Sequence, residues 1–184
     1  MKGWIQNMEL YDSGQKLTKD IIKRFENILG LSLPDDYKEF MMKTNGGTPE
    51  EDLAYSFIDV VTNKTNDSDL RELFVFYEDE ENDNFDDIMR IYKSMVNEKL
   101  IPPFFFPIGD DSGGDPLCMD LSQEEYGSIW FCDHELENSE TGYLAASKIA
   151  NSFTEFLDLL YEMTFDGDED DYSKMNEFLK EMGI

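Results

Sequence analysis

The side chains of this 184-residue chain that could do chemistry are mainly carboxylates, because 42 residues are Asp or Glu and only one is histidine. The clearest spacing runs from Asp166 to Glu177. Asp166, Asp168, Asp170 and Glu177 match positions 1, 3, 5 and 12 of a calcium-binding EF-hand loop. The sixth position is Asp171, however, where the sharp turn of such a loop needs glycine. We therefore expect no calcium site here, and no other metal site is indicated.

Other arrangements that would indicate catalysis or cofactor binding are missing from the sequence. His134 follows Asp133 at a predicted strand end, with no Gly-x-Ser-x-Gly or Cys–His motif beside it. The DDSGGD segment, Asp110–Asp115, lacks the lysine and the helix of a phosphate-binding loop, and it predicts a tight turn. No spacing singles out a carboxylate pair for glycoside hydrolysis. The sequence thus indicates neither an enzyme nor a bound cofactor.

The net charge of −27 is unevenly distributed along the chain. Residues 1–44 contain seven basic and seven acidic residues, whereas residues 45–184 contain eight basic and 35 acidic ones. Such a charge disfavours binding to nucleic acid or to an anionic membrane. A basic protein is the partner class that the charge favours.

The location of the protein is indicated by what its sequence lacks. No stretch is long and apolar enough to span a bilayer, and the first residues, MKGWIQNMELYDS, contain no apolar core of a secretory signal. Cys118 and Cys132 do not have zinc-ligand spacing, and they are interpreted as reduced thiols that could be neighbours on paired strands. We therefore expect a cytoplasmic protein.

The Leu29–Gly47 segment, LGLSLPDDYKEFMMKTNGG, predicts two helices joined by a short loop. Gly30 can end a helix over Lys19–Leu29, and Pro34 suits the first position of the next helix. Asn45-Gly46-Gly47 ends that helix with residues that tolerate left-handed backbone. The apolar positions expected to face the core are Ile21, Ile22, Phe25, Ile28 and Leu29 in the first helix and Tyr37, Phe40, Met41 and Thr44 in the second.

The remainder of the chain predicts a cluster of strands followed by helices, which is an α+β pattern. The acidic run Glu78–Asp87 and the segment Asn63–Asp69 are expected to be loops. Strands are expected over 53–61, 70–77, 104–109, 116–121, 128–134 and 142–147, and helices over 88–98, from Ser152 and near the C-terminus.

These segments resemble the SUKH superfamily, the Smi/Knr-type proteins. The first block matches the motif LG-x-x-LP-x-x-[YF]-x-x-F-L-x-x-x-NGG, and Phe104–Ser122 followed by Gly127–Glu135 matches a second block. The resemblance covers about Lys19–Tyr161, within a single domain 1–184 whose residues 162–184 add an acidic loop and a C-terminal helix. It implies an N-terminal helical hairpin packed on a central antiparallel sheet, with further helices at the C-terminus. The motif residues are Leu29, Gly30, Leu33, Pro34, Tyr37, Phe40, Asn45, Gly46, Gly47, Gly109 and Gly114.

The resemblance also implies a function in binding rather than catalysis. Bacterial members are immunity proteins that neutralise a cognate toxin domain, often a nuclease and encoded by a neighbouring gene. The alternative is a regulatory or scaffolding module without a toxin partner. An acidic surface would match the basic site of a nuclease. The residues predicted to bind the partner are Asp110, Asp111, Asp115, Trp130 and Asp133, although a core role for Trp130 is an equal alternative.

Overall fold

A computed structural model describes residues 8–78 and 84–163, and these residues form four helices and ten strands. The α+β prediction is confirmed. The helices are α1 (Lys19–Leu29), α2 (Asp35–Thr44), α3 (Ile88–Asn97) and α4 (Phe153–Leu159). The strands are β1 (Leu10–Tyr11), β2 (Thr48–Pro49), β3 (Leu53–Ile58), β4 (Thr65–Leu70), β5 (Glu72–Leu73), β6 (Phe105–Asp110), β7 (Pro116–Asp120), β8 (Ile129–Glu137), β9 (Leu144–Ala150) and β10 (Tyr161–Glu162).

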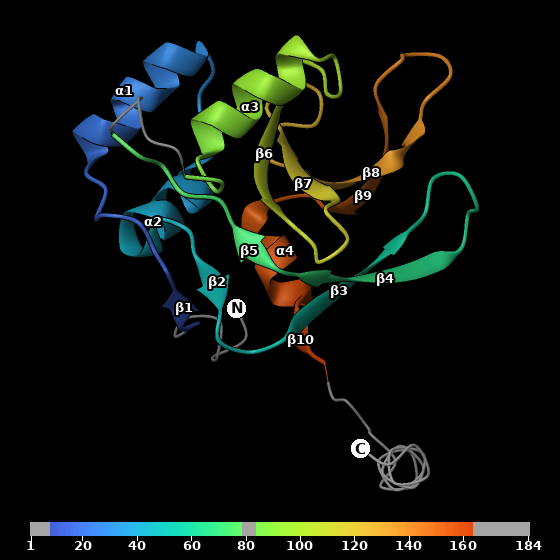
Figure 1. Ribbon diagram of the computed structural model, residues 1–184, viewed down its shortest axis with the longest axis horizontal. Helices are drawn as coiled ribbons and strands as arrows, with labels where there is room; N and C mark the ends of the chain where they lie inside the picture. Colours follow the sequence, from blue (N-terminus) through green and yellow to red (C-terminus); the bar gives the residue numbers. More distant parts are fainter. Residues whose placement is uncertain (1–7, 79–83, 164–184) are drawn as a thin grey trace, which may run out of the picture.

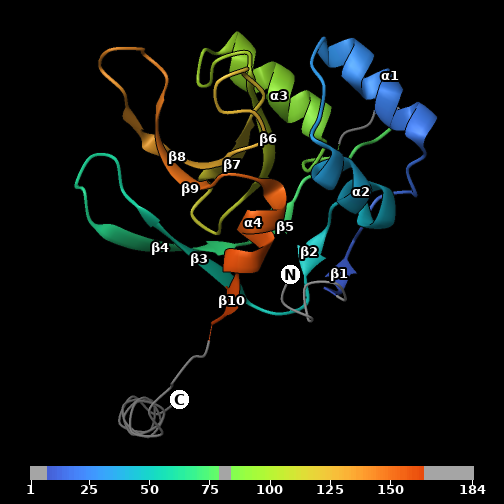
Figure 2. The same ribbon diagram turned by 180° about the vertical axis from the view of Figure 1, so that it is seen from behind.

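The strands form three antiparallel sheets rather than one. The largest has the order β5-β6-β7-β8-β9, the second has the order β10-β3-β4, and β1 pairs with β2. Helices α1 and α2 lie toward one side of the molecule, the β3–β4 and β8–β9 hairpins project toward the other, and α3 lies between them (Figures 1 and 2). The largest sheet corresponds to the predicted central sheet.

The predicted helical hairpin is present, and its caps follow from the sequence. Thr18 caps the N-terminus of α1, and Gly30, at φ 69°, ends that helix with its N–H bonded to the Glu26 carbonyl. Pro34 lies just before α2 rather than inside it. The buried face of α2 is centred on Tyr37 and Met41, which are 0% and 1% exposed.

Two expectations about the helix faces are wrong. Ile28 is 53% exposed, because it lies on the solvent side of the last turn of α1. Phe40 is half-buried rather than buried between the helices and the sheet, and its ring packs edge-on against Phe153 at 5.0 Å. The core around α2 therefore depends more on Tyr37 than on Phe40.

Asn45, Gly46 and Gly47 hold three distant parts of the chain together. The buried Asn45 amide donates to the carbonyls of Gln15 (2.8 Å) and Phe76 (3.0 Å), and its oxygen accepts from the Phe76 N–H (3.0 Å). A Cβ on Gly46 would lie 2.5 Å from a neighbouring backbone oxygen, and one on Gly47 would lie 2.3 Å from another. The glycines are needed because backbone packs directly on backbone at this point.

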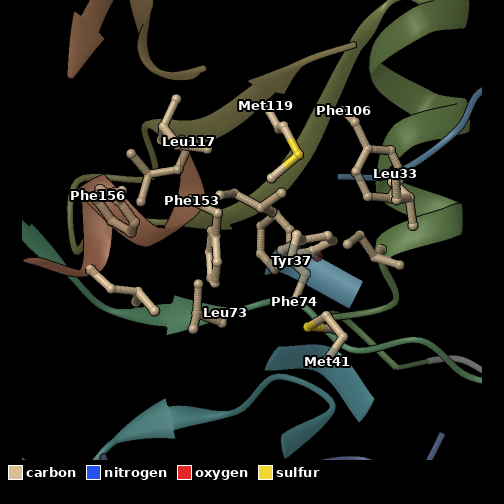
Figure 3. Packing of buried hydrophobic residues seen from close by; sticks show 14 of the residues in the cluster. Leu33, Tyr37, Met41, Leu73, Phe74, Phe106, Leu117, Met119, Phe153 and Phe156 are labelled. Atoms are coloured by element: carbon tan, nitrogen blue, oxygen red, sulfur yellow. The ribbon is translucent and has the colours of Figure 1, made fainter. Parts of the chain in front are cut away.

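The central strands β6 and β7 are buried on both faces, so two hydrophobic clusters form. Leu117 and Met119 join the large cluster beneath the helices (Figure 3), whereas Cys118 belongs to the smaller cluster on the other face. Successive side chains along β7 thus alternate between the two clusters. Cys118 and Cys132 are free, buried neighbours on the paired strands β7 and β8, and burial raises the pKa of the Cys118 thiol.

Several predicted boundaries need correction. Strand β3 ends at Ile58, where a turn begins, and the expected loop Asn63–Asp69 is mostly strand β4. Of the expected 70–77 strand, Leu70 is the last residue of β4, Glu72–Leu73 form β5, and residues 74–77 belong to no named strand. The expected strand 142–147 is β9, which extends to Ala150.

The C-terminal expectations are only partly covered by the described residues. Helix α4 is present, and Ser152 caps it by accepting from the Glu155 N–H at 3.0 Å. The predicted last helix and the acidic loop Asp166–Glu177 lie outside the described residues. Among the helices that are described, none combines the length and the apolar character that crossing a bilayer requires.

Candidate protein-interaction site

The Asp110–Asp115 segment forms the tight turn between β6 and β7, as predicted. The Asp111 N–H donates to the Asp115 carbonyl (3.1 Å), and the Gly114 N–H donates to the Asp111 carbonyl (3.1 Å). Gly114 has a φ of 89°, which favours glycine, whereas a Cβ there would meet no atom within 4 Å. Gly109 serves a different purpose, because its Cβ would lie 2.3 Å from the Glu72 carbonyl oxygen on the paired strand.

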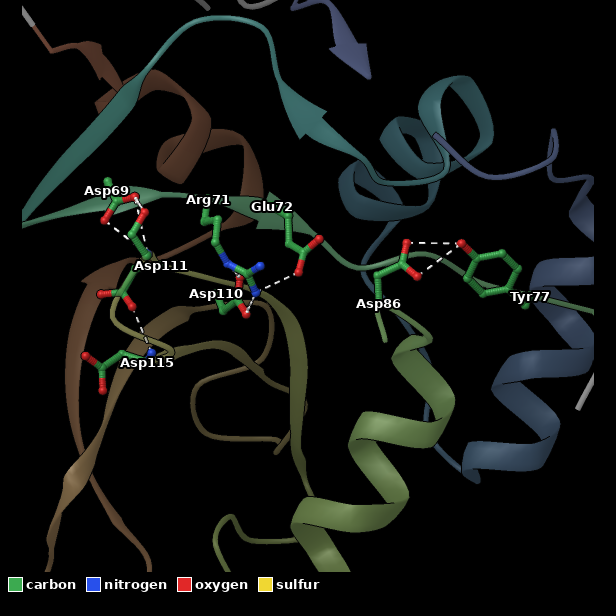
Figure 4. Close-up of polar contacts among 9 residues, drawn as sticks. Asp69, Arg71, Glu72, Tyr77, Asp86, Asp110, Asp111 and Asp115 are labelled. Atoms are coloured by element: carbon green, nitrogen blue, oxygen red, sulfur yellow. Dashed lines mark hydrogen bonds and ion pairs between the residues drawn. The ribbon is translucent and has the colours of Figure 1, made fainter. Parts of the chain in front are cut away.

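Asp110 is buried and forms an ion pair with Arg71 (Figure 4). Arg71 Nε donates to Asp110 Oδ1 at 3.0 Å, and a second guanidinium nitrogen contacts Oδ2. Arg71 also reaches Glu72 Oε1 at 2.7 Å. Burial raises the pKa of Asp110 to about 6, although Arg71 opposes the shift. This carboxylate therefore links β6 to the β4–β5 segment.

Asp111 is also buried and holds the turn against β4. Its carboxylate accepts from Ser68 Oγ and from the Asp115 N–H, the latter at 2.8 Å. On the same side, the Ser112 N–H donates to the Asp69 carboxylate at 3.2 Å. The turn is thus held to the second sheet by the carboxylate of Asp111 and by that of Asp69 on β4.

Asp115 and Asp133 accept hydrogen bonds from the second half of β8, near the turn between β8 and β9. Asp115 Oδ1 accepts from the His134 N–H and lies 2.7 Å from His134 Nδ1. This hydrogen bond and the aspartate charge raise the pKa of His134. Asp133 is half-buried and accepts from the Glu135 N–H at 2.8 Å. His134 therefore has a structural partner in the turn that precedes β7.

Trp130 is half-buried and packs against the smaller hydrophobic cluster. Its Nε1 donates to Ser128 Oγ at 2.8 Å, and Lys148 Nζ lies 5.8 Å from the ring centroid. Trp130 pairs with Cys118, three residues along β7 from Asp115, which is roughly 10 Å at the rise of a strand. The ring is therefore separated from the acidic turn by part of the sheet.

The structure places the five predicted residues on β6–β8 and the turn between β6 and β7, but it does not arrange them as an aromatic anchor within an exposed acidic rim. Asp110 and Asp111 were expected at the surface, and this is wrong, because they are 8% and 4% exposed. Their positions serve the fold. A role for any of the five residues in partner binding stays a prediction.

The sequence reasoning missed the exposed apolar residues Ile58, Val60 and Val61, which lie at the tip of the β3–β4 hairpin. The pattern of LAYSFIDVV instead predicts one continuous strand. The signal that could have located the turn is Asp59, because aspartate readily accepts hydrogen bonds from backbone N–H groups two or three residues later.

The described residues contain no group of three or more His, Cys, Asp or Glu side chains placed to hold a metal ion. The acidic turn is no exception, since its carboxylates accept from Arg71, Ser68 and backbone N–H groups. The geometry of this region supports structural linkage between the sheets.

Comparison with known proteins gives a family and a relative. The model of the SMI1 / KNR4 family (SUKH-1) matches residues 16–159. The chain is similar to the SPbeta prophage-derived uncharacterized protein YokK of Bacillus subtilis (strain 168), with 30% identity over 165 residues that cover 84% of this chain and 80% of the relative. The match includes both segments on which the resemblance rested, and the chain therefore belongs to the SMI1 / KNR4 family (SUKH-1).

Proposed function

We propose that this chain is an immunity protein that binds a basic toxin domain encoded by a neighbouring gene and neutralises it by covering its basic site. The family includes toxin immunity proteins. The observation that carries the proposal for this chain is its charge of −27, all of which arises after residue 44. A field of that sign attracts a basic domain and repels nucleic acid.

The described surface offers exposed carboxylates that can face such a partner. Glu135, Glu137 and Glu140 are exposed on the β8–β9 hairpin, and Glu50 and Glu51 are exposed in the segment between β2 and β3. Charges of this kind chiefly increase the rate of association and its dependence on salt. The buried Asp110 and Asp111 contribute to the field less directly, because their side chains are occupied within the fold.

Binding rather than catalysis is the activity that we propose. His134, the one histidine, is hydrogen-bonded through Nδ1 to Asp115 and lies on an exposed strand end. The thiols of Cys118 and Cys132 are buried, and burial disfavours the thiolate of Cys118. The buried thiols lack the accessibility that a nucleophile needs, and the ring of His134 is already hydrogen-bonded to Asp115.

The test is co-expression with the product of the adjacent gene. We expect a complex that survives purification, an association rate that falls steeply with ionic strength, and protection of cells that express the adjacent gene. Absence of both complex and protection would reject the immunity function and favour the regulatory or scaffolding alternative.

A further inference from the structure

Three apolar side chains are exposed at the tip of the β3–β4 hairpin. Ile58, Val60 and Val61 have 54%, 59% and 62% of their surface exposed. Isoleucine and valine are usually buried, and a group of them on the surface commonly marks a place where another molecule binds. We refer to these three residues as the apolar tip.

The backbone of the apolar tip is fixed by hydrogen bonds. The buried Asp59 carboxylate accepts from the Val61 N–H (3.1 Å) and from the Thr62 N–H (2.6 Å), and hydrogen bonds from Thr62 lower the pKa of Asp59. The Asn63 N–H donates to the Asp59 carbonyl (2.8 Å), and the Asp59 N–H donates to the Lys64 carbonyl (2.9 Å). Because the turn is already ordered, a partner that binds here loses little conformational entropy.

The apolar tip is also anchored to the five-stranded sheet. The Val60 N–H donates to the buried Ser147 Oγ of β9 at 2.9 Å. One residue before the tip, the ring of Phe57 stacks on Phe131 of β8, with centroids 4.5 Å apart. The hairpin is therefore a rigid projection, and its exposed side chains do not fold back onto the core.

The surroundings of the apolar tip are acidic. The β3–β4 and β8–β9 hairpins project at the same end of the molecule in both views, opposite α1 and α2 (Figures 1 and 2). Asp67 is exposed on β4, and three exposed glutamates lie on the β8–β9 hairpin. The basic residues of these two hairpins are Lys64, which is exposed in the turn of the tip, and Lys148, which is paired with Glu125. An apolar centre with a charged rim is the usual anatomy of a protein-binding surface.

We infer that the apolar tip is the anchor by which this chain docks a basic protein, with Ile58, Val60 and Val61 entering an apolar recess that lysine and arginine side chains surround. The charge selects this partner over a second copy of the chain, because two molecules carrying −27 repel each other. This inference rests on the proposed function and names the surface that performs it.

The test measures binding of the purified product of the adjacent gene to the full chain and to two variants. In the first variant, Ile58, Val60 and Val61 are all replaced by threonine, which keeps the β-branched shape and removes apolar surface. We expect its dissociation constant to rise at least about tenfold, mainly through faster dissociation. The matched control is Ile28→Thr, because Ile28 is 53% exposed on α1, at the other side of the molecule. The control should bind within about twofold of the wild type.

The outcomes separate this inference from the function on which it rests. If the wild-type chain does not bind the probe, the proposed function and this inference both fail. If the wild type binds and the threonine variant binds equally well, or if the Ile28→Thr control is weakened as much, the inference fails and the function stands. Sedimentation equilibrium supplies the remaining outcome, since a wild-type dimer that the threonine variant abolishes would assign the surface to self-association and overturn the choice of partner.

Discussion

Replacing Asn45 with alanine should lower the free energy of unfolding by about 3–5 kcal/mol. The change removes three hydrogen bonds of 2.8–3.0 Å and leaves the N–H and carbonyl of Phe76 without this partner in a buried environment. Each lost hydrogen bond contributes about 1 kcal/mol, and a buried polar group left unpaired costs about 1–3 kcal/mol. The φ of 52° at this position adds about 1 kcal/mol for alanine.

The measurement is a urea titration of the wild type and the variant, in which the midpoint should fall while the slope stays constant. The matched control is Asn63→Ala, because Asn63 has a similar φ of 54° and is exposed in a turn. It should lose only about 1 kcal/mol. Asn45→Gly, which relieves the backbone strain, should recover about that amount and no more. A loss in Asn45→Ala no larger than in Asn63→Ala would refute the argument that the amide holds the fold together.

Three further outcomes follow from the structure. Phe40→Ala should cost only about 1–3 kcal/mol in the same titration, because the ring is half-buried; a loss above about 4 kcal/mol would contradict that packing. Gly109→Ala should destabilise more than Gly114→Ala, since its Cβ meets backbone at 2.3 Å whereas Gly114 has open space; equal thermal shifts would contradict this. The pKa of His134, measured by NMR, should lie above 6.5 and return toward 6.5 in Asp115→Asn. The stability that the His134–Asp115 contact contributes is therefore present below pH 6.5 and is lost as the pH rises through the raised pKa. An unchanged pKa in Asp115→Asn would show that Asp115 is not the cause.

The helices were predictable from the sequence because their signals are local. Thr18, Gly30 and Ser152 cap or end helices through hydrogen bonds within a few residues, and the apolar spacing of α3 defines its face. Alternation along β7 was equally visible, since Leu117 and Cys118 face different clusters. The family motif also pointed to Asn45, but its long-range contacts with Gln15 and Phe76 have no local signature.

Strand β4 and the burial of Asp110 could not be predicted from the sequence, and the reason is the same for both. Thr65–Leu70 is a polar segment that becomes a strand only because β3 lies beside it. Asp110 appeared to be a surface charge, and its burial depends on Arg71, 39 residues earlier in the chain. Tertiary contacts determine both the pairing of β4 and the burial of Asp110, and such contacts cannot be read from the hydrophobic pattern or the composition of the sequence.

Strand β4 lies at the edge of its sheet, and its composition bears on aggregation. An edge strand presents unpaired backbone groups that can recruit strands from other molecules. Here that strand reads TNDSDL; asparagine and aspartate are depleted in strands, and the charges of Asp67 and Asp69 repel a second copy. The polar edge therefore lets the chain expose Ile58, Val60 and Val61 beside it while keeping its own copies from joining into extended sheets.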